Sequence, residues 1–457
     1  MTANEGGVRF PAGFIWGSGT SAYQVEGAID EDGRTPSIWD TFCRRAGAVL
    51  NGDSGAVAAD QYHRYPEDAQ LLRDLGHGMY RFSIAWPRIQ PDASGTVNQR
   101  GLDHYRRLVD TLLEVGVAPN ITLYHWDLPQ WLGDSGGWPV RETAERFAEY
   151  AAIVYGALHD RVDWWATLNE PWCSAFLGYC SGTFAPGRSD AGDSLAAIYH
   201  LILGHGLAVE RLRAAQARNV GIVLNLIPVV ADDLSMEPVV RHIDGLQNRI
   251  VLDLLAGRGV PSDLRESCAS VTDWAFVRDE DTPVLSAPID WLGENYYTIY
   301  RVAPVGEADA DAIGQETAAI PACPPMRFAP REPLTDMGWE ILPSGLESAL
   351  RMATDALPGV PLWVCENGAA IPEVTDEAGI HDQVRTDYVR DHLEVLMRMR
   401  EKGFDIRGYY VWSLLDNLEW ASGWTKKFGI VRVDPATGER TVKDSARWYR
   451  SLIAERG

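Results

Sequence analysis

The sequence predicts an α/β fold: a single (β/α)8 TIM barrel with elaborated loops at the C-terminal face of its strands. Eight short apolar runs typical of strands follow one another along the chain, with segments of helical periodicity between several of them. Polar and aromatic residues gather repeatedly just after the strand-like runs, where a parallel barrel carries its active site. Because no composition break or short repeat divides the chain, residues 1–457 are expected to form one catalytic barrel with an ordered core from about residue 10 to residue 453.

The composition is that of a globular chain that can bury a large core. Hydrophobic residues make up 46% and charged residues 23% of the 457 residues. The net charge of -23 repels nucleic acid and anionic membranes, so neither is an expected partner. The 17 tryptophans exceed the usual share, and aromatic platforms for sugar rings are a natural use for some of them.

The positions of the cysteines bear on metal binding, and the first residues bear on where the protein is located. The six cysteines are scattered and form no short-spaced pair of the zinc type, so no metal site is expected. The first 13 residues lack a basic segment followed by an apolar core, and no later run is long and apolar enough to span a bilayer. We therefore expect a cytoplasmic protein.

The first two strands are expected near the N-terminus. One lies within 10–24 and ends at Gln24, whose amide suits adjacent sugar hydroxyls but would more often bond the backbone. The Gly- and Asp-rich segment 30–62 predicts a long rim loop. The next strand, 78–86, contains Arg81. Because a buried arginine within a strand is costly unless it meets a carboxylate, we expect Arg81 to face one inside the barrel.

The remaining elements continue the alternation. Apolar spacing predicts helices at 65–75, 102–115, 141–158, 193–216 and 382–401. Strands are expected at 117–124, 162–168, 220–227, 289–296, 361–365 and 406–412. The Pro- and Ala-rich segment 303–333 lacks periodicity and predicts a long rim loop, which we expect to be mobile.

Two of these strands end at a glutamate, Glu170 after 162–168 and Glu366 after 361–365. A single glutamate in such a position is usually a solvated loop residue, so the pair must be judged by its surroundings. His125 and Trp126 follow another strand, and on their own they would more often pack than bind. Together these residues suggest two carboxyl groups and aromatic walls on one rim.

The motifs at the strand ends resemble glycoside hydrolase family 1. They cover nearly the whole chain, in the order and spacing of that family, at residues 16–17, 21–27, 81–83, 86–88, 124–129, 169–171, 295–297, 337–339, 366–368 and 412–420. The resemblance implies a retaining β-glycosidase with Glu170 as acid/base and Glu366 as nucleophile. It also implies that Arg81, Asn295 and Tyr297 support these two carboxyl groups.

The resemblance further implies the sugar-binding residues. Seven residues are expected to bind the nonreducing sugar: Gln24, His125, Trp126, Asn169, Trp412, Glu419 and Trp420. Among them, Trp412 is expected to stack beneath the sugar ring. Members of the family that act on 6-phosphosugars carry a small hydroxyl residue where this chain has Glu419, and a Lys and a Tyr slightly later. This chain has Lys426 and Phe428 there. Because a carboxylate repels phosphate, we expect an unphosphorylated sugar despite Lys426.

Four residues fall where the family lines the entrance for the leaving group, or aglycone: Trp172, Leu177, Asn225 and Trp339. Simple packing explains Leu177 equally well. The nucleophile motif departs from the family at Cys365, where a threonine is commoner. Because successive residues of a strand face opposite sides, we expect Cys365 to point away from Glu366.

These inferences predict a β-glucosidase that releases terminal nonreducing β-D-glucosyl residues from β-glucosides and cello-oligosaccharides, with β-galactosides and β-fucosides also accepted. The expected partner is a small β-glycoside, and the expected role is in cellulose degradation. No cofactor is needed by this chemistry. A noncatalytic sugar-binding relative, a transglycosylase or phosphoglycosidase, and a metal hydrolase are the alternatives. The residues leave the oligomeric state, including a homo-oligomer, open.

Overall fold

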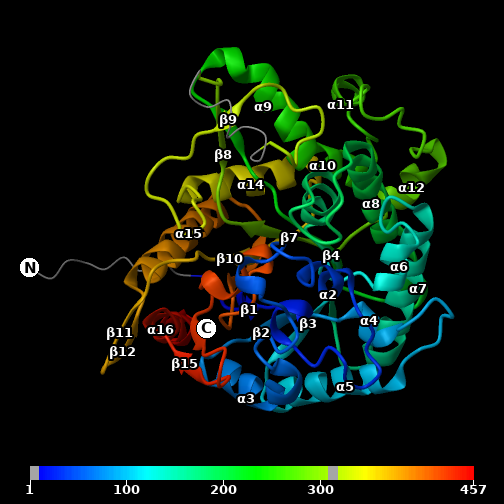
Figure 1. Ribbon diagram of the computed structural model, residues 1–457. Coiled ribbons are helices and arrows are strands. Elements are labelled where there is room, and N and C mark those ends of the chain that lie inside the picture. Colours follow the sequence, from blue (N-terminus) through cyan, green and yellow to red (C-terminus); the bar gives the residue numbers. More distant parts are fainter. Residues whose placement is uncertain (1–9, 307–316, 457) are drawn as a thin grey trace, which may run out of the picture.

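The computed structural model describes residues 10–306 and 317–456 (Figure 1). Within these ranges, eight parallel strands form a closed barrel: β1 (Ile15–Gly19), β2 (Met79–Ser83), β3 (Ala118–Tyr124), β4 (Trp164–Asn169), β5 (Val220–Leu224), β7 (Trp291–Tyr296), β10 (Leu362–Asn367) and β13 (Ile406–Trp412). β1 pairs with β2 on one side and with β13 on the other, which closes the ring. The predicted (β/α)8 barrel is confirmed.

Helices cover the outside of this barrel, as Figure 1 shows. The longer ones are α3 (Gln61–Asp74), α5 (Gln99–Glu114), α7 (Arg141–Leu158), α8 (Ala191–Ala214), α14 (Pro343–Ala356), α15 (Gln383–Glu401) and α16 (Asp444–Arg456). They form because apolar residues recur at helical spacing and bury one face; in α5 these residues are Leu102, Tyr105, Leu108, Val109 and Leu112. In the described part of the chain, no helix is long and apolar enough to cross a membrane.

Large side chains fill the barrel interior below the rim. One cluster joins residues of six strands: Met79, Ala166, Val223, Trp291, Trp363, Cys365 and Tyr410. Glycines on neighbouring strands make room for the large rings. A Cβ added at Gly221 would lie 2.5 Å from the Trp291 ring, and one added at Gly408 would lie 2.3 Å from the Trp363 ring. The barrel interior is therefore packed rather than hollow at this level.

Several predicted strands are longer than the observed ones. The segment 10–24 pairs only over β1, and the chain then turns into the short helix α1 (Ala22–Val25), which carries Gln24. The segment 78–86 pairs only over β2 and continues into α4 (Trp86–Ile89). The segment 220–227 ends as a strand at Leu224, which leaves Asn225 on the rim. The predicted strands extend too far because the apolar residues at the rim have the composition of a strand. No neighbouring strand is there to pair with them, so the observed strands end earlier.

Short elements were not predicted, because they span too few residues to show a period. They include the helices α2 (Ile38–Cys43), α6 (Gln130–Asp134), α9 (Glu237–Asp244), α10 (Ile250–Leu255), α11 (Ser262–Ser267) and α12 (Thr282–Leu285). They also include a small sheet of β6 (Val229–Ala231), β8 (Tyr300–Ala303) and β9 (Arg327–Phe328), and the hairpins β11 (Val374–Asp376) with β12 (Gly379–His381) and β14 (Val431–Val433) with β15 (Arg440–Val442). The longer helices α14 and α16 were also missed.

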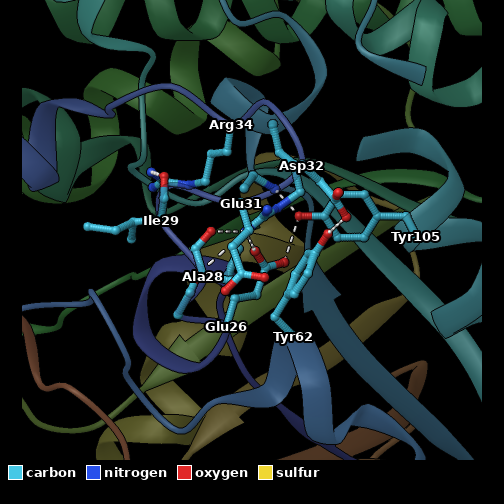
Figure 2. Close-up of polar contacts among 12 residues, drawn as sticks. Glu26, Ala28, Ile29, Glu31, Asp32, Arg34, Tyr62 and Tyr105 are labelled. Atoms are coloured by element: carbon cyan, nitrogen blue, oxygen red, sulfur yellow. Dashed lines mark hydrogen bonds and ion pairs between the residues drawn. The ribbon is translucent and has the colours of Figure 1, made fainter. Parts of the chain in front are cut away.

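The predicted loop 303–333 falls partly on residues 307–316, which lie outside the described residues. In its described part, β9 pairs with β8, so the segment is not wholly irregular. The predicted loop 30–62 likewise contains α2, and the residue Glu26 just before it is tied to α5 and α4. The carboxylate of Glu26 accepts hydrogen bonds from the Tyr105 hydroxyl (2.6 Å) and from Arg88 (3.1 Å). Figure 2 shows Glu26 and Tyr105 gathered with Asp32 and with Tyr62, whose hydroxyl donates to Asp32 at 2.5 Å.

Candidate active site

A cavity of about 280 Å³ opens at the C-terminal ends of the barrel strands. Most of the sequence-predicted site residues line it: His125, Trp126, Glu170, Trp172, Leu177, Asn225, Asn295, Tyr297, Trp339, Glu366, Trp412, Glu419 and Trp420. The other three, Gln24, Arg81 and Asn169, are buried and bond to residues of this set. The structure thus brings together residues that are spread over almost 400 positions of the chain.

Glu366, on β10, has a strong donor on each carboxylate oxygen. Arg81 on β2 donates to its Oε1 at 2.7 Å, and the Tyr297 hydroxyl donates to its Oε2 at 2.6 Å. The expectation that Arg81 meets a carboxylate inside the barrel is confirmed. Burial raises the pKa of Glu366, while the charge of Arg81 and the hydrogen bonds of Tyr297 and Arg81 oppose this rise. These donors favour the ionised form of Glu366 over that of a second, less supported carboxyl group nearby.

Glu170 is that second carboxyl group. It follows β4 directly and is also buried. Asn295 donates to its Oε1 at 2.6 Å, and the Cys173 thiol lies 3.0 Å from its Oε2. Burial and the nearby charge of Glu366 raise the pKa of Glu170 to about 7. The pair therefore holds one carboxyl group suited to remain ionised and one suited to carry a proton at neutral pH.

Asn169, the last residue of β4, links the two carboxyl groups to the cavity wall. Its Oδ1 accepts hydrogen bonds from Arg81 Nη2 (2.6 Å) and from Asn295 Nδ2 (3.0 Å). Its Nδ2 lies 3.0 Å from His125 Nε2, and its backbone carbonyl accepts from Trp126 Nε1 at 2.9 Å. One residue at a strand end therefore holds four neighbours, three through its side chain and one through its backbone carbonyl.

Gln24 supports the opposite side of the cavity. Its Nε2 donates to Asn417 Oδ1 and to the Leu418 carbonyl, both at 3.0 Å, and it lies 3.5 Å from Glu419 Oε2. Burial and the charges of Glu366 and Glu170 raise the pKa of Glu419 to about 8. The Gln24 amide thus holds the rim segment that carries Glu419.

Aromatic rings wall the cavity. Trp126 and Trp420 pack with ring centroids 4.4 Å apart, and the His125 ring is roughly parallel to Trp412 at 6.1 Å. Trp126, Glu170 and Trp420 have φ angles of 78°, 44° and 47°, in the left-handed region that residues other than glycine rarely adopt. Such conformations persist only where the surrounding structure enforces them, and they cluster at functional sites.

Comparison with known proteins identifies the family. The family model described as glycosyl hydrolase family 1 matches residues 7–457. The chain belongs to glycosyl hydrolase family 1. Among similar curated proteins, a bifunctional beta-D-glucosidase/beta-D-fucosidase of Bifidobacterium breve is 45% identical, with 98% of each chain covered. Beta-glucosidase A of Thermotoga maritima is 40% identical, also with 98% of each chain covered.

Solved structures agree with this assignment. The GH1 beta-glucosidase from Exiguobacterium antarcticum matches with a TM-score of 0.91 and 40% identity, covering 98% of each chain. The psychrophilic beta-glucosidase from Micrococcus antarcticus matches with a TM-score of 0.92 and 42% identity, again over 98% of each chain. The chain is a family 1 glycoside hydrolase.

The outer part of this hydrolase's cavity is largely apolar. Trp172 and Leu177 line the main cavity and also a second one of about 110 Å³. Tyr300 is shared in the same way, and Ile320 and Phe328 from the predicted long loop form part of the second cavity's wall. The described part of that loop therefore lies beside the outer cavity.

The strand that carries Glu366 departs from simple alternation. The register of β10 against β7 shifts between Val364 and Glu366. Cys365 joins the interior cluster, next to Gly293, and Glu366 also reaches inward to Arg81. The expectation that Cys365 points away from Glu366 is therefore wrong, because the irregular register turns two successive residues to the same side of the strand.

Sequence reasoning missed several cavity residues: Cys173, Phe184, Ile227, Thr298 and Tyr300. Cys173 could have been found, because a residue three positions after Glu170 faces it once the chain coils after the strand. Phe184 and Tyr300 carried no signal, since their approach depends on how the rim loops fold. Among the described residues, no group of three or more His, Cys, Asp or Glu side chains is arranged to hold a metal ion.

Proposed function

We propose that this family 1 hydrolase is a retaining β-glucosidase. It removes terminal nonreducing β-D-glucosyl residues from β-glucosides and cello-oligosaccharides, with residues 1–457 acting as one catalytic barrel. The observation that carries the proposal is the pair of buried carboxyl groups in one cavity, of which only Glu366 is bonded to Arg81 and Tyr297. The names of the similar proteins support glucosides as substrates.

In the first half-reaction, Glu366 acts as the nucleophile and Glu170 as the acid. A carboxylate oxygen of Glu366 attacks the anomeric carbon while the bond to the leaving oxygen breaks, and that oxygen takes the proton of Glu170. This mechanism needs the two carboxyl groups about 5 Å apart. A short separation is supported by Asn169 Oδ1, which accepts hydrogen bonds both from Arg81, the partner of Glu366, and from Asn295, the partner of Glu170.

In the second half-reaction, Glu170 acts as the base. The bond between Glu366 and the sugar removes the negative charge of Glu366, so the pKa of Glu170 falls and Glu170 remains ionised. Water attacks the anomeric carbon, gives a proton to Glu170 and displaces Glu366 as a carboxylate. Two inversions leave the product with the configuration of the substrate.

The glycone, the nonreducing sugar, is proposed to lie over Trp412. Its hydroxyl groups would meet polar groups of Gln24, His125, Trp126, Asn169, Glu419 and Trp420. Lys426 donates to the Asp336 carbonyl at 2.5 Å, which supports an unphosphorylated sugar. The Bifidobacterium relative named for both glucosidase and fucosidase supports acceptance of β-fucosides, and we propose β-galactosides as well.

The aglycone is proposed to leave through the apolar outer cavity lined by Trp172, Leu177, Asn225 and Trp339. Apolar and aromatic side chains there suit aryl groups or the face of a second sugar. The position of Ile320 and Phe328 beside this cavity supports a role for the segment 303–333 in aglycone choice.

We further propose that the enzyme acts in the cytoplasm, on oligosaccharides from cellulose degradation. All six cysteines lie in the described residues and are unpaired, as is usual in a reducing compartment.

The decisive experiment compares wild type, Glu366→Gly and Glu170→Ala on an activated aryl β-glucoside, with and without azide. Both variants are expected to lose most activity. Azide should rescue Glu366→Gly as an α-glycosyl azide, because azide attacks in place of the nucleophile with one inversion. It should rescue Glu170→Ala as the β-glycosyl azide, because azide then opens the covalent intermediate.

The same assay can contradict the proposal. An inactive wild type on every aryl β-glycoside would favour a noncatalytic sugar-binding protein. Full activity of Glu366→Gly, or a β-azide from that variant, would mean that another group is the nucleophile. Glu347→Ala is the matched control, because it removes a carboxyl group that pairs with Arg351 on α14 at a distance from the cavity.

A further inference from the structure

The residue that follows the acid/base by three positions is a buried cysteine in direct contact with it. The Cys173 sulfur lies 3.0 Å from Glu170 Oε2. The backbone N–H of Cys173 also donates to the Glu170 carbonyl at 3.0 Å, at the start of the π-helix Cys173–Ser181. The backbone hydrogen bond holds the thiol in place, so the contact does not depend on a flexible side chain alone.

The surroundings orient the thiol hydrogen towards Glu170. Asn225 Nδ2 donates to the Cys173 sulfur at 3.5 Å, and Gln247 Nε2 donates to the backbone carbonyl of Asn225 at 2.9 Å. Because the sulfur accepts from Asn225, its own hydrogen is left for the carboxyl group. Asn295 occupies the other oxygen of Glu170, so each oxygen has one donor.

We propose that Cys173 is a positioning residue for the acid/base: its S–H group donates to Glu170 when Glu170 is ionised, and Asn225 keeps the thiol in that orientation. The inference rests on the proposed function, in which Glu170 must be protonated in the first half-reaction and ionised in the second. Cys173 moves no proton, and its hydrogen stays on sulfur throughout.

A thiol suits this role because it is a weak donor. A strong donor would hold Glu170 as a carboxylate and weaken it as an acid, whereas no donor would leave the carboxylate poorly stabilised when it must act as a base. Burial and the neighbouring Glu170 charge raise the pKa of Cys173 well above its ordinary value, so the thiol remains protonated beside the carboxylate.

Other ionisable groups also face Glu170, and they come from several elements. They are Arg81 on β2, Glu294 on β7, Tyr297 after β7, Tyr300 on β8, Glu366 on β10 and Glu419 after β13. A substitution at Cys173 leaves all of them in place. A change in the titration of Glu170 can therefore be assigned to the thiol.

The test measures the pH dependence of kcat/KM for Cys173→Ala and Cys173→Ser. Loss of the donor in Cys173→Ala is expected to raise the pKa of Glu170 and to move the alkaline limb up by about half a pH unit. Cys173→Ser keeps a donor and should leave the limb where it is or lower it. Cys268→Ala, which removes a buried thiol outside the cavity, is the control and should not move the limb.

A second readout separates positioning from simple packing. With a dinitrophenyl β-glucoside, whose release needs little acid assistance, kcat of Cys173→Ala should fall at acidic pH because Glu170 is protonated more of the time. An unchanged limb in Cys173→Ala, or equal shifts in the Ala and Ser variants, would overturn the inference. A 13C NMR titration of Glu170 reads the same shift without turnover, so an inactive wild type would sink the proposed function while still deciding the role of Cys173.

Discussion

At the scale of the residue, the site depends on the buried positive charge of Arg81. Arg81 is fully buried, and such a group is tolerated only because its guanidinium meets Glu366 and Asn169 at 2.7 and 2.6 Å. The same contact gives Glu366 the cation that keeps it ionised. Compensation of a buried charge and activation of a carboxylate are therefore one interaction.

Replacing Arg81 with methionine tests this double role. Removal of the cation should raise the pKa of Glu366, so the acidic limb of kcat/KM should move to higher pH. Activity at pH 6 should fall on the order of 100-fold, because more of Glu366 is protonated and a charged donor is lost. The pH profile of kcat/KM checks the shift, and circular dichroism checks that the variant is folded.

Tyr297→Phe is the matched control, since it removes one neutral donor from the same carboxylate and leaves the cation. Its acidic limb should move in the same direction by a smaller amount. An acidic limb that stays in place in Arg81→Met would mean that Arg81 does not control the ionisation of Glu366.

At the scale of the element, the position of the rim depends on close packing between helices as well as on strand pairing. Glycines within helices mark the closest approaches. Gly206 in α8 faces α12, and a Cβ added there would lie 1.9 Å from the Val284 carbonyl oxygen. Gly156 in α7 is exposed, and an added Cβ would meet no atom within 4 Å.

The same Gly→Ala substitution should therefore have opposite effects at these two positions. Gly206→Ala should destabilise the protein by about 1–3 kcal/mol or more, because backbone must move. Gly156→Ala should stabilise it by about 0.5–1 kcal/mol, because alanine loses less conformational entropy in a helix. The thermal midpoints of the two variants and wild type, measured at one scan rate, give the sign of each stability change. Shifts of the same sign in both variants would contradict the packing argument.

At the scale of the whole molecule, the first and last strands of the barrel meet. β1 pairs with β13, and Tyr449 on α16 donates to the Gly17 carbonyl of β1 at 3.2 Å. Arg440 on β15 pairs with Asp68 on α3 at 2.9 Å, and both side chains are almost fully buried. The C-terminal segment thus stabilises the first βα unit. It thereby also stabilises the ring of strands that carries the site.

Asp68→Ala tests that closure. It leaves Arg440 as an uncompensated buried cation and should cost about 3–5 kcal/mol of stability. The double variant Asp68→Ala with Arg440→Met removes both charges, so it should be more stable than Asp68→Ala alone. The thermal midpoints of the two variants and wild type decide this; a double variant less stable than Asp68→Ala would show that the charge is not the cause.

Much of this architecture could be predicted, because short stretches of the sequence specify its helices and strands. The period of apolar residues predicted the bounds of 141–158 as a helix, and the order of the eight strands followed from simple alternation. Glu170 and Glu366 could be named because strand ends of a parallel barrel share one rim. Elements of two to eight residues, such as β9 and α12, carry too little periodicity to be recognised.

The sequence by itself determined the fold class, the family and the two carboxyl groups. These follow from the periodicity of apolar residues and from short motifs at the strand ends, both of which are local features of the sequence. Only the tertiary structure decided which donor reaches which oxygen: Tyr297 and Arg81 at Glu366, and Asn295 and Cys173 at Glu170. It also decided that Glu366 turns inward on the same side as Cys365, where the register of β10 shifts. Such contacts join distant segments at distances of about 3 Å, and no local pattern specifies them.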